Sequence, residues 1–220
     1  MRIGFGYDVH RLVSGRRLIL GGVPIPHEKG LEGHSDADVL LHALCDGILG
    51  AMGEGDIGKH FPNTDPRFRG ISSLELLRSV ALMMARKKWN VENLDTTVVA
   101  EQPMIGPYIP QMVDQIAGTL QIPAGKINIK ATTSEGLGFI GEKKGIVAYA
   151  VVLLTSKNNM PTGTVIPRDF NFWRAKSDSC ALGKRCIKDR SSRTPADFCS
   201  RASRAYPFLS WAAASLFPLG

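Results

Sequence analysis

The sequence predicts an α+β domain, a mixed β-sheet with helices on one face, followed by a basic segment of different composition. Strand-like alternation and helical apolar spacing follow one another in the order two strands, two helices, strand, helix, two strands. The 220 residues, of which 44% are hydrophobic and 21% charged, are enough to bury a full core. We expect the arrangement to be related to ferredoxin-like folds.

The first strand is predicted at Gly4-Phe5-Gly6-Tyr7-Asp8-Val9-His10, where aromatic residues alternate with small or polar ones. In an extended backbone, Phe5 and Tyr7 face one side, and Asp8 and His10 face the other. We expect the aromatic side to be core and the other side to carry chemistry, with the glycines leaving room for a ligand. A carboxylate and an imidazole two residues apart can bind one cation, although an exposed strand face is the common alternative.

A third ligand is predicted on the helix that follows. Residues 38–49 carry apolar side chains at helical spacing, which indicates an amphipathic helix that Ser35 or Asp36 can cap. His42 lies on this helix, and Asp46 lies one turn later, where its carboxylate can orient the imidazole ring. Two histidines and one aspartate leave one position of a tetrahedral zinc open, as catalytic sites do.

The remaining elements are predicted from periodicity and turn residues. We expect strands at 17–26, 94–100, 127–131 and 145–154, and helices at 107–120 and after the capping pair Ser72 and Glu75. The segments 27–36 and 59–66 have the glycines, prolines and polar residues of loops, which often carry function. The strand at 145–154 is almost entirely apolar, which predicts a central position in the sheet.

The net charge of +7 comes from the end of the chain. Residues 156–220 hold 11 Lys and Arg against 4 Asp, which leaves 16 basic and 16 acidic residues before them. No nucleic acid is therefore expected to bind the main domain. We expect a domain at 1–155 and a basic, disordered extension at 156–220, with an arm that touches RNA or lipid as the alternative.

The cysteines and the hydropathy indicate neither a disulfide-rich nor a membrane-spanning protein. Cys45 lies on the apolar stripe of its helix and is expected to be a buried thiol. Cys180, Cys186 and Cys199 lie in the extension without the CxxC spacing of a metal site. No apolar run has the length of a membrane span, and the first residues have a strand pattern rather than that of a signal sequence. We expect a cytoplasmic protein without a membrane partner.

Several ordered motifs then carry a resemblance to a known enzyme family. Besides residues 4–10 they are His34-Ser35-Asp36-Ala37-Asp38-Val39 with His42-Ala43-Leu44, Gly55-Asp56-Ile57-Gly58, Phe61-Pro62-Asn63-Thr64-Asp65-Pro66, Ile109-Pro110-Gln111-Met112, and Lys130-Ala131-Thr132-Thr133-Ser134-Glu135-Gly136-Leu137-Gly138-Phe139. On these motifs, residues 1–154 resemble the 2-C-methyl-D-erythritol 2,4-cyclodiphosphate synthases.

The resemblance implies a phosphorus-oxygen lyase of the non-mevalonate isoprenoid route. Members of this family are homotrimers with active sites between subunits. They convert 4-diphosphocytidyl-2-C-methyl-D-erythritol 2-phosphate into the cyclic diphosphate and release CMP. Because the substrate's own 2-phosphate is the nucleophile, the protein must supply positioning and charge neutralisation at the β-phosphorus rather than a nucleophilic side chain.

The resemblance also implies roles for single residues. Asp8, His10 and His42 would hold Zn²⁺, and Glu135 would hold Mg²⁺ or Mn²⁺ with the substrate diphosphate. His34 and Thr133 would stabilise the transition state. From the residues alone, His34 as a mobile-loop residue, Thr133 as a strand-end hydroxyl and Glu135 as a solvated loop residue remain the alternatives.

The positions implied in substrate binding fall into three groups. Those near the metal and the methylerythritol phosphate are Asp8, Val9, His10, His34, Ser35, Asp56, Ile57, Gly58, Phe61, Pro62, Asn63, Thr64 and Asp65. Those of the cytidine pocket are Ala100, Glu101, Gln102, Pro103, Met104, Ile105 and Gly106 together with Ala131, Thr132 and Thr133. The others are Ser134, Glu135 and Phe139.

Two positions depart from the family pattern. Met104 stands where lysine is common, so a phosphate contact is missing or replaced. Glu142, followed by Lys143 and Lys144, stands where arginine is common. In the family this arginine lines the central channel of the trimer and can meet isoprenoid diphosphates, and the adjacent lysines can restore the positive charge from other directions.

Two other functions are compatible with parts of the sequence. A zinc phosphohydrolase acting on a nucleotide-activated substrate would release inorganic phosphate or a linear product. A noncatalytic nucleotide- or RNA-binding protein led by its basic segment would bind with strong salt dependence and need no metal.

Overall fold

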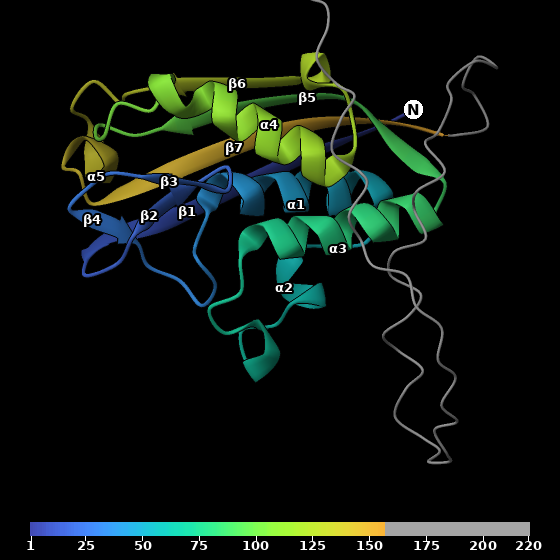
Figure 1. The fold of residues 1–220 in the computed structure, drawn as a ribbon, viewed down its shortest axis with the longest axis horizontal. Coiled ribbons are helices and arrows are strands. Elements are labelled where there is room, and N and C mark those ends of the chain that lie inside the picture. The colour runs from blue at the N-terminus through green and yellow to red at the C-terminus, as the bar shows by residue number, and fades with distance from the viewer. Residues whose placement is uncertain (157–220) are drawn as a thin grey trace, which may run out of the picture. The chain divides into compact units, whose positions relative to one another are not determined.

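The computed structural model describes residues 1–156, which form a mixed β-sheet with helices on one face (Figure 1). The predicted α+β class is thereby confirmed. The strands are β1 (Arg2–Ser14), β2 (Leu18–Leu20), β3 (Val23–Ile25), β4 (Lys29–Leu31), β5 (Trp89–Val99), β6 (Ile127–Thr132) and β7 (Gly145–Ser156). The α-helices are α1 (Val39–Met52), α2 (Ile57–His60), α3 (Ser73–Arg86), α4 (Ile109–Leu120) and α5 (Gly138–Gly141). The predictions about the three later cysteines and residues 157–220 lie outside the described residues.

Five strands form the main sheet in the order β4-β1-β7-β5-β6, so the apolar strand β7 is central, as predicted. β7 pairs antiparallel with β1 on one side and with β5 on the other. β5 and β6 run parallel, because the chain crosses between them through α4. The loops that follow β5 and β6 therefore leave the sheet at the same edge.

Helix α1 packs on β1 at very short range because β1 presents glycines to it. Gly4 and Gly6 are buried under α1, and a Cβ atom built on them would lie 1.8 Å from Gly47 O and 1.9 Å from Ala43 O. The glycines therefore make room for a helix backbone and not for a ligand, which corrects the prediction.

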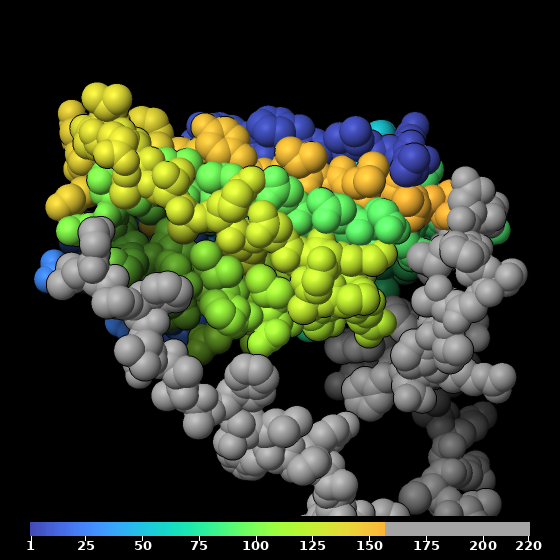
Figure 2. All heavy atoms as spheres, turned by 90° about the horizontal axis from the view of Figure 1, so that it is seen from above, coloured from blue at the N-terminus to red at the C-terminus, as the bar shows by residue number. Residues whose placement is uncertain are grey.

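The aromatic side of β1 is not the core, which is a second correction. Phe5 and Tyr7 are 62% and 45% exposed, because the sheet buries its glycine side under the helices and leaves the other side uncovered in this chain. Tyr149 of β7 lies beside them, with ring centroids 6.4 Å from Phe5 and 5.4 Å from Tyr7. Figure 2 shows β1 in blue, β7 in orange and β5 in green as successive bands.

The start of α1 is fixed by Asp38, which is fully buried and caps the helix in place of the predicted Ser35 or Asp36. Its carboxylate accepts hydrogen bonds from the backbone N–H groups of Leu41, Gly21 and Gly22. Burial raises the pKa of Asp38 to about 6 against these donors, which lower it. One side chain thus joins α1 to the turn between β2 and β3.

That turn also corrects the strand predicted at 17–26. Gly21 and Gly22 adopt positive φ angles of 57° and 77°, so the segment folds back as a two-stranded hairpin of β2 and β3. The other predicted strands and helices are confirmed, although β5 begins five residues before the predicted strand at 94–100, and Ser72 caps α3 as expected. The predicted loops 27–36 and 59–66 are corrected, because the first contains β4 and the second begins with the end of α2. Cys45 is buried, as predicted. Among residues 1–156, no helix combines the length and the apolar character needed to cross a membrane.

The close packing of α1 on β1 predicts a large effect for a small substitution. Gly6→Ala places a methyl group where the Ala43 carbonyl lies, so we expect a loss of about 1–3 kcal/mol in the free energy of unfolding. Gly118→Ala is the matched control, because its added Cβ meets nothing within 4 Å inside α4 and improves helix propensity. Thermal unfolding measures both, and a Gly6→Ala chain as stable as the parent would contradict the packing.

Candidate metal centre and substrate-binding site

Asp8, His10 and His42 come together on the helix side of the sheet and form the one candidate metal cluster among the described residues. Asp8 Oδ2 lies 2.9 Å from His10 Nε2 and 3.0 Å from His42 Nδ1, and the two imidazole nitrogens are 3.0 Å apart. The side chains are 13–24% exposed, so the cluster is sheltered but reachable. The close approach of α1 to β1 is what brings His42 to the strand residues.

These three atoms fit a metal ion. Zinc bonds to nitrogen and oxygen are about 2.0–2.2 Å long, which puts the ligand atoms of a tetrahedral site about 3.3–3.6 Å apart. The observed triangle needs to open by only a few tenths of an ångström to hold such an ion. Three protein ligands leave a fourth position for a water or a substrate oxygen, as catalytic zinc sites do.

The electrostatics of the cluster point to the same use. Burial would raise the pKa of Asp8, but hydrogen bonds from His10 and His42 outweigh it and hold that pKa well below its usual range. For His10, burial lowers the pKa, but the hydrogen bond and charge of Asp8 raise it above the ordinary value. The carboxylate and the two imidazoles thus face one another across the space that a cation can take.

Each histidine is held from behind by an oxygen. His10 Nδ1 donates to the backbone oxygen of Glu32 at 2.7 Å. His42 Nε2 lies 2.9 Å from Ser73 Oγ and 3.1 Å from Ser35 Oγ. Both rings therefore turn their other nitrogen toward Asp8, as ligands with outer hydrogen-bond partners do.

The prediction that Asp46 orients His42 is wrong. Asp46 Oδ1 instead accepts the backbone N–H of Ile57 at 2.7 Å, which fixes the start of α2 against α1. Helical spacing correctly placed the Asp46 carboxylate on the same flank of α1 as His42. The carboxylate bonds instead to a backbone N–H at the start of α2, where N–H groups have no partner within the helix. The actual partner, Ser73, lies 31 residues from His42, and no sequence spacing indicates it.

His34 lies on an exposed loop whose backbone is clamped on both sides. Arg16 donates to Gly33 O at 2.8 Å and to Ser35 O at 2.7 Å, and Gly70 N–H donates to His34 O at 2.8 Å. The side chain of His34 is thus presented from a fixed backbone, one residue before Ser35, which touches the ligand His42. Arg16 was not indicated by any motif.

The loops after β5 and β6 form a second group, at the edge where both parallel strands end. Glu101 Oε1 accepts from Ser134 N–H and Ser134 Oγ, both at 2.9 Å, and from Gly136 N–H at 3.2 Å. The predicted cytidine segments 100–106 and 131–133 therefore lie side by side. Carboxyl ends of parallel strands are the usual place for a ligand in such sheets.

Thr133 and Glu135 belong to this second group and not to the metal cluster. Thr133 Oγ1 donates to Glu135 Oε1 at 3.1 Å, and Glu135 N–H donates back to Thr133 Oγ1 at 3.3 Å. Glu135 has a positive φ of 53°, unusual for a residue with a side chain, and it is exposed. The loop thus holds a hydroxyl and a carboxylate together at the surface.

The segment between α1 and α3 carries the remaining predicted positions. Asp56 caps α2 by accepting Lys59 N–H, and Phe61 stacks edge-on against Phe68 at 5.3 Å. Asp65 caps the next turn and pairs with Arg67. The other positions of this segment, Ile57, Gly58, Pro62, Asn63 and Thr64, are half-buried or exposed.

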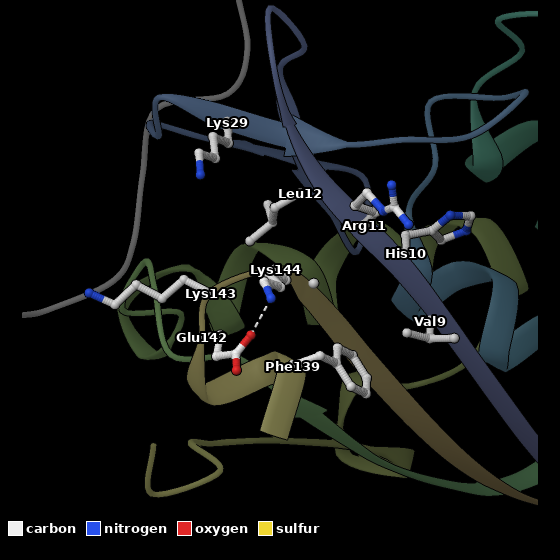
Figure 3. Close-up of a pocket in the computed structure, with 10 residues that line it drawn as sticks. Val9, His10, Arg11, Leu12, Lys29, Phe139, Glu142, Lys143 and Lys144 are labelled. Atoms are coloured by element: carbon white, nitrogen blue, oxygen red, sulfur yellow. Dashed lines mark ion pairs between the residues drawn. The ribbon is translucent and has the colours of Figure 1, made fainter. Parts of the chain in front are cut away.

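A groove of about 770 Å³ lies between the end of β1, which includes His10, and the segment that joins α5 to β7 (Figure 3). Glu142, one of the two departures from the family pattern, lines it just after α5 and pairs with Lys144. Lys143 adopts a positive φ of 57° and extends outward. Val9 and Phe139 also line the groove. Met104, the other departure, is 80% exposed.

Comparisons with known proteins identify the family of the described domain. A sequence profile of the YgbB family matches residues 1–155. The 2-C-methyl-D-erythritol 2,4-cyclodiphosphate synthase of Geotalea uraniireducens is 60% identical over 157 residues, which are 71% of this chain and 100% of that protein. The synthase of Syntrophobacter fumaroxidans is 56% identical over 71% of this chain and 98% of its own length.

A solved structure of a 2-C-methyl-D-erythritol 2,4-cyclodiphosphate synthase described as a CDP-bound form also matches. It superposes with a TM-score of 0.65 at 39% identity, covering 70% of this chain and all of that one. The matches extend over the whole described domain and the full length of the relatives. The chain therefore belongs to the YgbB family, whose matching members are named 2-C-methyl-D-erythritol 2,4-cyclodiphosphate synthase.

Proposed function

We propose that this chain is a lyase that converts 4-diphosphocytidyl-2-C-methyl-D-erythritol 2-phosphate into 2-C-methyl-D-erythritol 2,4-cyclodiphosphate and CMP. The observation that carries the proposal is the Asp8, His10 and His42 triangle on a domain that matches named synthases over their full length. An oxygen of the 2-phosphate attacks the β-phosphorus, and the bond from that phosphorus to the bridging oxygen breaks. CMP leaves with that oxygen, so no water is consumed.

The residues of the chain supply positioning and charge in this reaction. When bound, Zn²⁺ at Asp8, His10 and His42 and Mg²⁺ or Mn²⁺ at Glu135 neutralise phosphoryl oxygens as Lewis acids. We propose that His34 and Thr133 donate hydrogen bonds to oxygens that gain charge at the β-phosphorus. Support for this comes from the fixed backbone of His34 and from Thr133 Oγ1, which stands next to the Glu135 carboxylate.

Substrate recognition is proposed to follow the two structural groups. The loops 100–106 and 131–135 at the end of β5 and β6 would hold the cytidine and its phosphate, and Phe139 would lie beside them. The segments 56–58 and 61–65 would hold the methylerythritol phosphate. The hydrogen bonds of Glu101 to Ser134 and Gly136 support the first assignment, because they keep the two loops together.

We also propose that the enzyme works in the cytoplasm as a homotrimer with active sites between subunits. The uncovered sheet face supports a partner copy: Ile3, Phe5 and Val151 are 73%, 62% and 44% exposed on it. Apolar faces of this kind mark protein interfaces. Within one chain the metal cluster and the Glu135 loop are separate groups, as expected if neighbouring subunits each contribute one of them to an active site.

The activity and its metal are tested together. The chain with zinc and magnesium is expected to turn the cytidyl substrate into the cyclic diphosphate and CMP, identified by phosphorus NMR. Asp8→Ala, His10→Ala and His42→Ala should each lose bound zinc and most of the turnover, since each removes one of three ligands. His27→Ala removes a histidine outside the cluster and should behave as the parent.

The products decide between the candidate functions. Inorganic phosphate or a linear diphosphate would instead indicate a zinc phosphohydrolase. Full activity of a metal-free His42→Ala chain would remove the zinc assignment.

The role of Glu135 is tested by Glu135→Gln. This variant is expected to retain zinc, the assembly and cytidine binding, because Glu135 is exposed and outside the zinc cluster. It should lose most of the cyclisation rate and its dependence on added magnesium or manganese, since an amide is a poorer ligand for a hard cation. Glu28→Gln is a control on an exposed glutamate. Unchanged divalent dependence in Glu135→Gln would place the second metal on other ligands.

The domain assignment is tested by a chain cut after Ser156. We propose that residues 1–155 are the catalytic domain and that the basic segment 156–220, most of which lies outside the described residues, has no part in catalysis. Light scattering should then give the mass of three chains for the cut protein, with the turnover of the full chain. A monomer, or an insoluble product, would show that the extension supports the assembly.

A further inference from the structure

We propose that Asp36 and Ser73 are positioning residues that fix His42 in its metal-binding tautomer through a chain of hydrogen bonds. The chain runs from the Asp36 carboxylate to Ser73 Oγ, at 2.5 Å, and from Ser73 Oγ to His42 Nε2, at 2.9 Å. His42 Nδ1, at the other side of the ring, faces Asp8 Oδ2. The inference rests on the metal that the proposed function places at this cluster.

The direction of each hydrogen bond follows from what the groups can donate. An ionised carboxylate only accepts, so the single hydroxyl proton of Ser73 is directed to Asp36. The oxygen of Ser73 is then left as an acceptor toward His42 Nε2. That nitrogen therefore carries a ring proton, and once a metal displaces the proton that Nδ1 shares with Asp8, the lone pair of Nδ1 faces the metal.

Ser35 cannot fix the tautomer by itself. Its Oγ lies 3.1 Å from His42 Nε2 and accepts the N–H of Ala37 at 3.0 Å. Its hydroxyl proton is not committed to a carboxylate, so it can rotate toward Nε2 and favour the opposite tautomer, with the proton on Nδ1. The carboxylate behind Ser73 is what distinguishes the two serines.

The backbone around the chain is fixed independently of the Ser73 hydroxyl. Asp36 N–H donates to Ile71 O at 3.0 Å, and Ser73 N–H donates to both oxygens of Asp36 at 3.0 and 3.1 Å. The segment before α1 is thus bound to the first residue of α3, and Ser73 itself is fully buried. Ser73→Ala therefore removes the hydroxyl that links Asp36 to His42, while the backbone contacts remain.

Zinc affinity of the full chain, measured by competition with a chelator, tests the proposal. Ser73→Ala should bind zinc about 10- to 100-fold more weakly than the parent, the range for an outer partner of a metal ligand. Asp36→Asn should weaken binding in the same direction. The double variant should bind no more weakly than Ser73→Ala alone, because both residues act through one hydrogen-bond chain.

Asp46→Asn is the matched control. Its carboxylate is one turn from His42 but bonds to Ile57 N–H, and the amide oxygen can still accept that bond, so zinc affinity should equal that of the parent. Additive losses of zinc affinity in the Asp36 and Ser73 double variant would show that the two residues do not act through one series of hydrogen bonds, and would overturn the proposal. Parent-like zinc affinity of Ser73→Ala would also overturn it.

A second measurement separates positioning from a structural effect. In the zinc-saturated full chain with ¹⁵N-labelled histidine, the Nε2–H proton of His42 should exchange slowly with water in the parent, because it donates to Ser73 Oγ, and faster in Ser73→Ala. The same exchange rate of this proton in both proteins would contradict the proposal. If the parent itself binds no zinc, the metal assignment of the proposed function fails, whereas zinc binding that is equal in the parent and in Ser73→Ala overturns only the positioning role.

Discussion

The contact on which the rest of the domain depends is the packing of α1 directly on the glycines of β1. With a side chain at Gly4 or Gly6, the helix would have to move away from the sheet by the width of a methyl group or more. His42 would move with it, and its Nδ1 now lies 3.0 Å from Asp8 Oδ2 on the strand. The metal cluster is therefore a consequence of backbone packing, which the core of the domain stabilises.

This packing also explains how the side chains of Asp8, His10 and His42 keep a defined geometry: the elements that carry them are held in place by the core. Asp8 and His10 stand on the strand next to the central β7, and His42 stands on a helix whose start is fixed by Asp38. Sites on regular elements hold their geometry better than sites on loops. The groups proposed to meet the moving phosphates, His34 and Glu135, stand instead on loops that single side chains, Arg16 and Glu101, hold in place.

Much of this was predictable from the sequence, and the failures share one physical cause. Periodicity indicated the long strands, the long helices and the candidate ligands Asp8, His10 and His42, because alternation and helical spacing report which residues share a face. It did not report which face of β1 is buried, since Phe5 and Tyr7 look like core residues in one chain. It also missed Ser73 and predicted Asp46, because the partner of His42 is set by how α3 returns to α1, and that is a tertiary contact.

The two faces of β1 impose opposite demands, and these demands connect the candidate metal site with the proposed assembly. The glycine side must stay small so that α1 can bring His42 to Asp8, which places all the bulk of the strand on the other side. That side then carries Ile3, Phe5 and Tyr7 into solvent in a single chain, where an apolar surface is costly. A strand that positions the candidate ligands in this way leaves an apolar face uncovered in a single chain, and the proposed homotrimer would bury that face between copies.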